Sequence, residues 1–306
     1  MLQRQRASPM PALVAERTEQ VGDTALVLFA YNRPAALAHT ISSITASLEM
    51  LSRELPEYGG VPILISLDGP RPTPESRRLV DAVEQGARRG LPGARIRREP
   101  VNRGLPSVLL ATLNELFDTQ EITRALCIED DVELSPTALL ALLTLSNSLR
   151  SGGAAERGHV IGAAPLHADG SVEHQALLVD AQAHRATRDL LEEYIKKFNL
   201  DGAARDGAYG LRDHDAITRW SRTLAQGSGL PAPLGTSQDR MRELAWKRAG
   251  VLLAGTPVRL VKHRGLWGQH NTPWYALRTG QLFQRLNREP WDRLKMRLER
   301  FTREGS

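Results

Sequence analysis

The feature that most constrains the fold is a regular alternation of buried strands and amphipathic helices between residues 24 and 150. Short apolar runs rich in β-branched residues predict strands, and apolar residues that recur every three or four positions predict helices. Elements that alternate in this way form βαβ units around a mainly parallel sheet, with right-handed crossovers. We therefore expect a Rossmann-like α/β half. Its strands lie near 24–30, 62–67, 94–98 and 124–128, and its helices near 34–52, 75–88, 105–117 and 135–149.

The second half of the chain is less regular. Residues 166–214 are polar, mixed and hard to assign, and residues 227–235 form a Gly/Pro-rich connector. Helical spacing returns over 236–249, a strand is expected over 256–262, and a mobile loop over 264–273. We expect this half to be smaller and less regular than the first.

Composition excludes several classes of protein. No apolar run approaches 18 residues, and residues 1–20 lack the continuous apolar core of a signal peptide. The single cysteine, Cys127, lies inside a predicted strand, which favours a buried small side chain in a reducing cytoplasm. The net charge of +5 is interspersed with acids, and no nucleic-acid-binding motif stands out. We expect a cytoplasmic protein that does not bind nucleic acid.

Three consecutive carboxylates, Glu129, Asp130 and Asp131, follow the strand predicted at 124–128. Acids at the end of a buried strand repel each other and lose hydration, so a compensating positive charge is expected. A divalent cation that carries a diphosphate is the commonest such partner. The triple therefore favours an enzyme that handles a nucleotide-activated substrate.

Other polar clusters follow the remaining strands of this half. In open α/β sheets, ligands bind beyond the carboxyl ends of the strands, so these clusters should converge on one rim. The turn chemistry of Asn32-Arg33-Pro34 and Asp68-Gly69-Pro70 explains those residues equally well without a function. The clusters are Tyr31-Asn32-Arg33, Asp68-Gly69, Asn102-Arg103-Gly104 and Glu129-Asp130-Asp131.

Four motifs together resemble the GT-A glycosyltransferases. They are FAYNRP after the first strand, ISLDG after the second, NRGL before a helix, and CIEDDVELSP. The pattern is most similar to the group around N-acetylglucosaminyltransferase I and its bacterial relatives, in which E-D-D replaces D-x-D. The match covers roughly residues 24–150, in order. It implies a GT-A type fold and transfer of a sugar from a nucleotide donor, with UDP favoured, to a hydroxyl acceptor.

The resemblance also implies roles for individual residues. Asp131 would coordinate Mn²⁺ or Mg²⁺, while Glu129 and Asp130 face the sugar nucleotide. Arg33 and Asp68 would contact the base or its ribose. The full set of nucleotide-sugar-binding residues implied in this half is Ala30, Tyr31, Asn32, Arg33, Asp68, Asn102, Arg103, Gly104, Glu129 and Asp130.

An inverting reaction needs no protein nucleophile, but it needs one general base to take the proton of the acceptor hydroxyl. Asp239 is the candidate, because enzymes of this resemblance carry an Asp ahead of a helix at a comparable position. The alternative is structural, with Thr236 or Ser237 capping a helix and Asp239 in its first turn. Glu243, one turn later, is the reserve candidate.

The segment after the strand predicted at 256–262 holds glycines, a Trp and two histidines. In this fold a late loop often closes over the donor. Trp267 would cover the sugar, and His270 would bind the metal or the diphosphate. His263 is interpreted as structural, because a lone His more often is.

The C-terminal segment carries Trp291, Leu294, Leu298 and Phe301 on one helical face, with Arg and Lys around them. Such a stripe usually packs on its own domain or on a partner. The alternative is peripheral contact with the inner face of a membrane that carries a lipid-linked acceptor.

The expected organisation has four segments. They are a flexible N-terminus (1–20), a nucleotide-sugar-binding half (21–165), an acceptor-binding and catalytic half (166–275) and a basic helical tail (276–306). The acceptor is expected to be a glycan, a lipid-linked molecule or a small molecule, recognised by residues 169–213.

Two other functions remain open from the sequence. A nucleotidyltransferase acting on a sugar phosphate would usually have a Gly-rich loop after the first strand, and residues 30–33 contain no glycine. A non-catalytic nucleotide-sugar-binding protein is the third hypothesis. The retained acids argue against it, and the weak match in the second half keeps it open.

Overall fold

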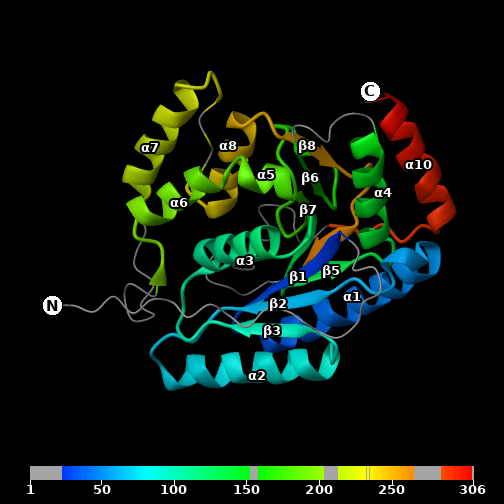
Figure 1. Cartoon of the computed structure of the whole chain (residues 1–306), viewed down its shortest axis with the longest axis horizontal. Helices are drawn as coiled ribbons and strands as arrows, with labels where there is room; N and C mark the ends of the chain where they lie inside the picture. Colours follow the sequence, from blue (N-terminus) through cyan, green and yellow to red (C-terminus); the bar gives the residue numbers. More distant parts are fainter. Residues whose placement is uncertain are drawn as a thin grey trace.

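The central element of the fold is a seven-stranded sheet with the order β3-β2-β1-β4-β7-β6-β8 (Figure 1). The computed structural model describes residues 23–151, 158–202, 213–231, 233, 235–264 and 284–304. β7 is antiparallel to both of its neighbours, and every other pair in this sheet is parallel. The sheet strands are β1 (Thr24–Ala30), β2 (Ile63–Leu67), β3 (Arg95–Arg98), β4 (Arg124–Glu129), β6 (His159–Gly162), β7 (Ala176–Asp180) and β8 (Leu252–Gly255).

Helices cover both faces of the sheet, and a small second sheet lies beside it. The second sheet pairs β5 (Val132–Leu134) with β9 (Val261–His263). The described helices are α1 (Pro34–Glu54), the 3-10 turn η1 (Pro56–Tyr58), α2 (Pro74–Gly90), α3 (Leu105–Thr119), α4 (Ala138–Ser151), α5 (Ala181–Arg185), α6 (Arg188–Lys197), α7 (His214–Gln226), α8 (Gln238–Arg248) and α10 (Trp291–Glu304).

The alternating side chains of the strands build two apolar cores, one on each face. Leu26 and Leu28 of β1 pack in the core that contains α1, α2 and α4. Val27 and Phe29 point the other way, into the core that contains α3 and Trp246 of α8. Because successive side chains of a strand face opposite sides, a strand buried on both faces reads as a continuous apolar run. This pattern made the run 24–30 recognisable.

The predicted α/β architecture with a mainly parallel, helix-flanked sheet is confirmed. The strands and helices expected over residues 24–150 are all present, and α4 begins three residues later than expected. The strand predicted over 256–262 is wrong: β8 ends at Gly255 and β9 begins only at Val261. Pro257 lies in the middle of that stretch, and proline has no N–H for a strand ladder.

Polar side chains on α1 hold β5 in place directly after the acidic triple. The Thr40 hydroxyl donates to the carbonyl of Val132 at 2.8 Å and accepts the Val132 N–H at 3.1 Å. Ser43 accepts the N–H of Leu134 at 3.1 Å. On the side of β5 that faces α1, these side-chain bonds take the place of a neighbouring strand. They therefore fix the chain after Asp131 against α1.

The C-terminal helix α10 packs beside α4 (Figure 1). Leu294 and Leu298 are fully buried there, whereas Phe301 is exposed. Most of the apolar stripe is therefore covered by the chain's own domain. The described part of the chain contains no helix with the length and apolar character needed to cross a membrane.

Two further expectations can be compared with the fold. Cys127 is buried as predicted, and burial raises the pKa of its thiol to about 12. The sheet takes β7 and β8 from beyond residue 165. The division into four segments stays a prediction.

His184 gives the fold a definite pH dependence. Its ring is buried, and its Nε2 lies 2.7 Å from the side-chain oxygen of Asn114. Burial, reinforced by the positive charge of Arg242, lowers its pKa from 6.5 to about 4. Between these values the unfolded chain binds more protons than the folded one, so stability falls as the pH drops from about 6.5 to 4. We expect this group to contribute about 3 kcal/mol to that loss.

Urea unfolding at several pH values checks this expectation. His184→Gln should flatten the slope between pH 6.5 and 4, because glutamine does not titrate. His39→Gln is the matched control, since His39 is exposed on α1. An unchanged slope in His184→Gln would contradict the assignment.

Candidate functional site

The ends of β1, β2 and β4 bring the predicted polar clusters to one edge of the sheet. Ala30 pairs with Leu67 of β2, and Phe29 pairs with Glu129 of β4. The residues that follow these strands are therefore neighbours, and the backbone N–H of Tyr31 donates to Asp130 at 2.9 Å. The Ala30 carbonyl accepts the N–H of Asp68 at 3.0 Å. We call this edge the rim.

Arg33 supplies positive charge to two of the three acids. Its guanidinium contacts Asp130 at 2.5 Å and also forms an ion pair with Asp131. The carboxylates are only 1% and 2% exposed. Burial raises the pKa of Asp130 to about 6, against the opposing effect of Arg33. The sequence led us to expect a cation beside these acids. Arg33 supplies part of that positive charge.

His263 is the second side-chain partner of Asp131. Its Nε2 lies 3.1 Å from Asp131 Oδ2. The position follows from the pairing of β5 with β9, in which Val132 lies opposite His263. Burial tends to raise the pKa of Asp131, but His263 and Arg33 hold it below its usual range. Asp131 is therefore a buried, ionised carboxylate.

The surroundings of Asp131 fit a divalent cation. Its Oδ1 atom is buried and has no hydrogen-bond partner. A carboxylate oxygen is a ligand that Mn²⁺ and Mg²⁺ prefer, so Asp131 would hold such an ion through Oδ1. Within the described residues, no group of three or more His, Cys, Asp or Glu side chains is arranged to hold a metal ion. The metal assignment of Asp131 stays a prediction.

Asp68 fastens the loop 101–104 to the rim. Its carboxylate accepts the backbone N–H groups of Gly69, Arg103 and Gly104 at 2.7–3.0 Å, and the side-chain amide of Asn102 at 2.7 Å. Burial raises its pKa to about 6, although those backbone donors act in the opposite direction. All of these bonds are internal, so the structure places Asp68 as the support of the loop.

Close backbone packing continues at the same loop. A Cβ on Gly69 would lie 2.4 Å from the backbone of Val101. Gly104 has a φ of 83°, a conformation that favours glycine. Arg103 extends outward and pairs with Asp201 at 2.6 Å. The four-residue loop is therefore held on both sides.

Asp239 lies in the first turn of α8, where the side chain of Ser237 accepts the N–H of Arg240. The cap expected from the structural alternative is therefore present. Asp239 also reaches the rim: burial, then the negative charges of Asp131 and Asp239, raise the pKa of Glu129 well above its usual range. The two interpretations of Asp239 are compatible, since Ser237 provides the cap and the Asp239 carboxylate is left facing His174 at 3.8 Å.

Some expected site residues lie outside the described part of the chain. These are Trp267 and His270. Asn32 is half-buried at the rim, between Tyr31 and Arg33. The loop expected over 264–273 is described only at Arg264, whose N–H donates to the carbonyl of Asp131 at 2.7 Å.

Three residues near the rim were not predicted. His263 was interpreted as structural, because a lone His more often is; the pairing that places it beside Asp131 joins segments about 130 residues apart, which no local pattern indicates. His174 falls in the stretch that could not be assigned. Arg242 is 4% exposed, and its guanidinium lies 4.8 Å from the centre of the Trp246 ring. Helical spacing from Asp239 is the only sequence signal that points to Arg242.

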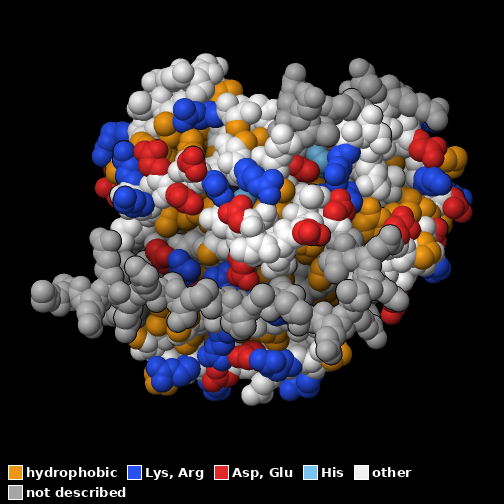
Figure 2. Space-filling view, viewed as in Figure 1, with side chains coloured by type: hydrophobic (Ala, Val, Ile, Leu, Met, Phe, Trp, Pro, Cys, Tyr) orange, Lys and Arg blue, Asp and Glu red, His pale blue; other side chains and the backbone are white. Residues whose placement is uncertain are grey.

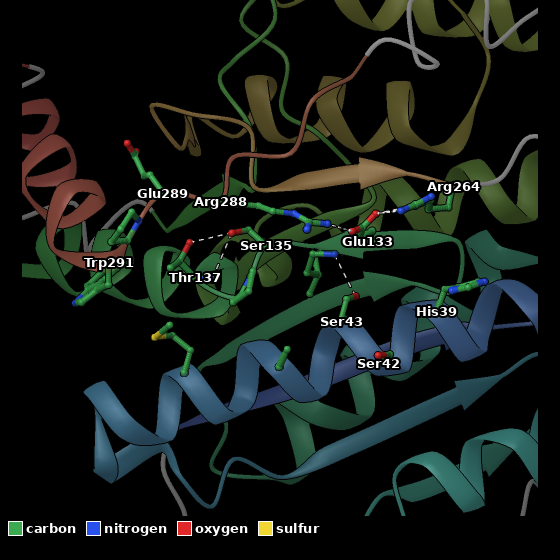
Figure 3. A pocket seen from close by; sticks show the side chains of 15 residues that line it. His39, Ser42, Ser43, Glu133, Ser135, Thr137, Arg264, Arg288, Glu289 and Trp291 are labelled. Atoms are coloured by element: carbon green, nitrogen blue, oxygen red, sulfur yellow. Dashed lines mark hydrogen bonds and ion pairs between the residues drawn. The ribbon is translucent and has the colours of Figure 1, made fainter.

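A separate cavity of about 460 Å³ lies along α1 (Figure 3). His39, Ser42 and Ser43 of α1 form one wall, and Glu133 of β5 lies opposite. Arg264 and Arg288 both form ion pairs with Glu133, from either side of it. The pair with Arg264 ties β5 to the end of β9 and so helps to hold His263 beside Asp131, whereas the pair with Arg288 ties β5 to the segment before α10.

Charge at the surface is mixed rather than segregated. Figure 2 shows Lys and Arg side chains interspersed with Asp and Glu over the face turned to the viewer. This agrees with the interspersed charges of the sequence.

Comparison with known proteins gives only distant likenesses. No protein-family model matches the chain, and no curated protein matches it. TarS 1–349 of S. aureus has a TM-score of 0.41 and 11% identity, over 79% of this chain and 60% of that one. TarS 1–349 in complex with UDP-GlcNAc has a TM-score of 0.34 and 10% identity, over 58% and 48%.

A third solved structure, that of mannose-1-phosphate geranyltransferase from Thermus thermophilus, has a TM-score of 0.34 and 16% identity. The likeness covers 57% of this chain and 64% of that one. The chain spans less than two thirds of each of these proteins. All three TM-scores lie below 0.5, so the likenesses support no inference about function.

The ion pairs of Arg33 yield a stability prediction. Arg33→Met leaves Asp130 and Asp131 buried without their main counter-charge. We expect a loss of about 3 kcal/mol in the free energy of unfolding, measured by urea denaturation at neutral pH. Arg53→Met is the control, because Arg53 pairs with Glu54 at the surface and such pairs contribute little. Equal stability of the two variants would show that another charge balances the acids.

Proposed function

We propose that the protein is a metal-dependent, inverting glycosyltransferase of the GT-A type that transfers a sugar from a UDP donor to a hydroxyl acceptor. The observation that carries the proposal is the meeting of two groups at the rim. The acids at the end of β4 and Asp239 at the start of α8 come from segments far apart in the chain. They are nevertheless linked through one short segment: the N–H of Glu129 donates to the carbonyl of Gln175 at 3.0 Å, and the ring of the preceding residue, His174, lies 3.8 Å from Asp239.

The proposed donor site uses the strand ends for binding. Arg33 presents a forked guanidinium that suits phosphate oxygens or the carbonyls of uracil. The loop 101–104 gives this side of the site a fixed wall, because Asp68 holds it through four hydrogen bonds. A pre-formed wall lowers the entropy cost of binding.

The reaction needs charge neutralisation on one side of the sugar and a base on the other. Asp131, with His263, would hold a divalent cation, which when bound neutralises the charge that develops on the departing diphosphate. Asp239 would take the proton of the acceptor hydroxyl. This arrangement requires no covalent intermediate with the protein, as expected for inversion.

The acceptor is proposed to enter beside α6, α7 and α8. An aromatic cluster of Tyr194, Phe198 and Trp220 joins α6 to α7, with ring centres 5.4–6.1 Å apart. These helices lie beyond α3 in Figure 1, on the side of the sheet that carries Asp239. Of these helices, α6 belongs to residues 169–213, the region from which we expect acceptor recognition, and α7 follows directly after it.

A thermal-shift panel of UDP-, GDP- and dTDP-sugars with and without Mn²⁺ tests the proposal. We expect UDP-GlcNAc with Mn²⁺ to raise the melting temperature, because a ligand that binds only the folded state stabilises it. At about 100 times its Kd the ligand adds about 2.7 kcal/mol. Asp131→Ala should abolish the part of this stabilisation that depends on Mn²⁺.

Asp81→Ala is the matched control, since Asp81 lies on α2 and pairs with Arg98 at the surface. It should respond to donor and metal as the wild type does. Mn²⁺-dependent stabilisation that survives in Asp131→Ala would overturn the metal assignment. A wild type that responds to no nucleotide sugar would overturn the proposed function.

A further inference from the structure

His174 occupies an unusual position beside α8. The side chain is 12% exposed, and both ring nitrogens are buried without a hydrogen-bond partner. The ring stacks on Trp246, with centres 5.6 Å apart and planes 8° from parallel. Packing, rather than hydrogen bonding, therefore holds the imidazole in place. Buried polar atoms without partners are rare and require an explanation.

Each ring nitrogen faces a carboxylate. Nδ1 lies 3.8 Å from Asp239 Oδ1, and Nε2 lies 3.8 Å from Glu243 Oε2. The two acids are four residues apart on α8, so they project from the same side of the helix. At 3.8 Å neither contact is a hydrogen bond, but a shift of less than 1 Å would bring either pair within hydrogen-bond distance. The three side chains make an acid–imidazole–acid row.

Glu243 is the fixed end of this row. Its side chain is 5% exposed and is held by Lys247 at 2.6 Å and Arg240 at 3.2 Å. Burial tends to raise its pKa, but His174 and Lys247 hold that pKa below its usual range. Glu243 is therefore an ionised acceptor committed to internal partners, which makes it a poor alternative to Asp239 as the base.

Asp239 is the open end of the row. Its side chain is 34% exposed, yet Oδ1 is buried and lacks a hydrogen bond. The exposed surface therefore belongs to the rest of the Asp239 side chain. Oδ1 faces His174, and the exposed part of the side chain remains open to a substrate.

We propose that His174 is a positioning residue that aligns the carboxylate of Asp239 through Oδ1, with Glu243 holding the opposite nitrogen of the ring. The inference rests on the proposed function. In the transfer, the acceptor oxygen bonds to the anomeric carbon and gives its proton to Asp239. The bond from that carbon to the diphosphate breaks, and its electrons leave with the diphosphate. His174 does not touch the sugar; it limits rotation of the base that does the chemistry.

Hydrolysis of UDP-GlcNAc with Mn²⁺, measured as UDP release, tests this role. His174→Phe keeps a ring that can stack on Trp246 but removes both nitrogens. We expect the hydrolysis rate to fall on the order of 100-fold, because misplacing a reacting group costs this much. The Kd for UDP-GlcNAc and the melting temperature should stay near those of the wild type. A purely structural role would change the melting temperature instead.

Three variants complete the experiment. Asp239→Asn should lose hydrolysis and keep donor binding, and His184→Phe, at a buried histidine on α5, should hydrolyse at the wild-type rate. Glu243→Gln should lower the hydrolysis rate without changing the Kd for UDP-GlcNAc. If His174→Phe does not fold, the rate of Glu243→Gln alone tests the role of His174. Wild-type rates in both His174→Phe and Glu243→Gln, with an inactive Asp239→Asn, would overturn the inference and leave the proposed function intact.

A measurement without turnover covers the case of very slow hydrolysis. In ¹⁵N-histidine NMR spectra, the Nδ1 signal of His174 should shift when Asp239 is changed to Asn and when UDP-GlcNAc is added. An Nδ1 signal that responds to neither would overturn the inference. Failure of the wild type to bind any nucleotide sugar would count against the proposed function instead.

Discussion

Asp130 and Asp131 end a central strand with two carboxylates that water hardly reaches, and their charge must be balanced from within the protein. Arg33, which precedes the first turn of α1, contacts both of them. The same helix holds β5 through Thr40, so both the acids and the chain that follows them are anchored to α1. His263 adds a second side-chain partner from β9. Removing a partner from such a buried group is costly, so the start of α1, β5 and β9 are coupled through these carboxylates.

The charge balance around Asp131 leaves one of its carboxylate oxygens unpaired, although the residue is buried. Asp131 uses Oδ2 for Arg33 and His263, while its Oδ1 has no hydrogen-bond partner. On the other side, Asp239 has one oxygen turned to His174 and surface left for a substrate. Both groups are only partly satisfied, as expected where a ligand completes the set.

Much of the fold could be predicted from the sequence, because doubly buried strands such as 24–30 have unbroken apolar runs and the helices between them have regular spacing. The convergence of Arg33, Asp68 and the acids followed from the rule for strand ends. β5 was not predicted. Its three residues bond to side chains of α1 and to β9, and the sequence around β5 carries no pattern that indicates partners so distant in the chain. For the same reason His263 and His174 could not be assigned: their neighbours are set by pairings and packing between distant segments.

We expect one rim to hold both the cation and the donor sugar. A crystal structure of the protein with UDP-GlcNAc and Mn²⁺, with the metal located by anomalous scattering, tests this most directly. We expect the Mn²⁺ signal at Asp131, the diphosphate beside Arg33, and the anomeric carbon on the side that faces Asp239. A metal signal away from Asp131, or a nucleotide bound in the cavity along α1, would contradict the account.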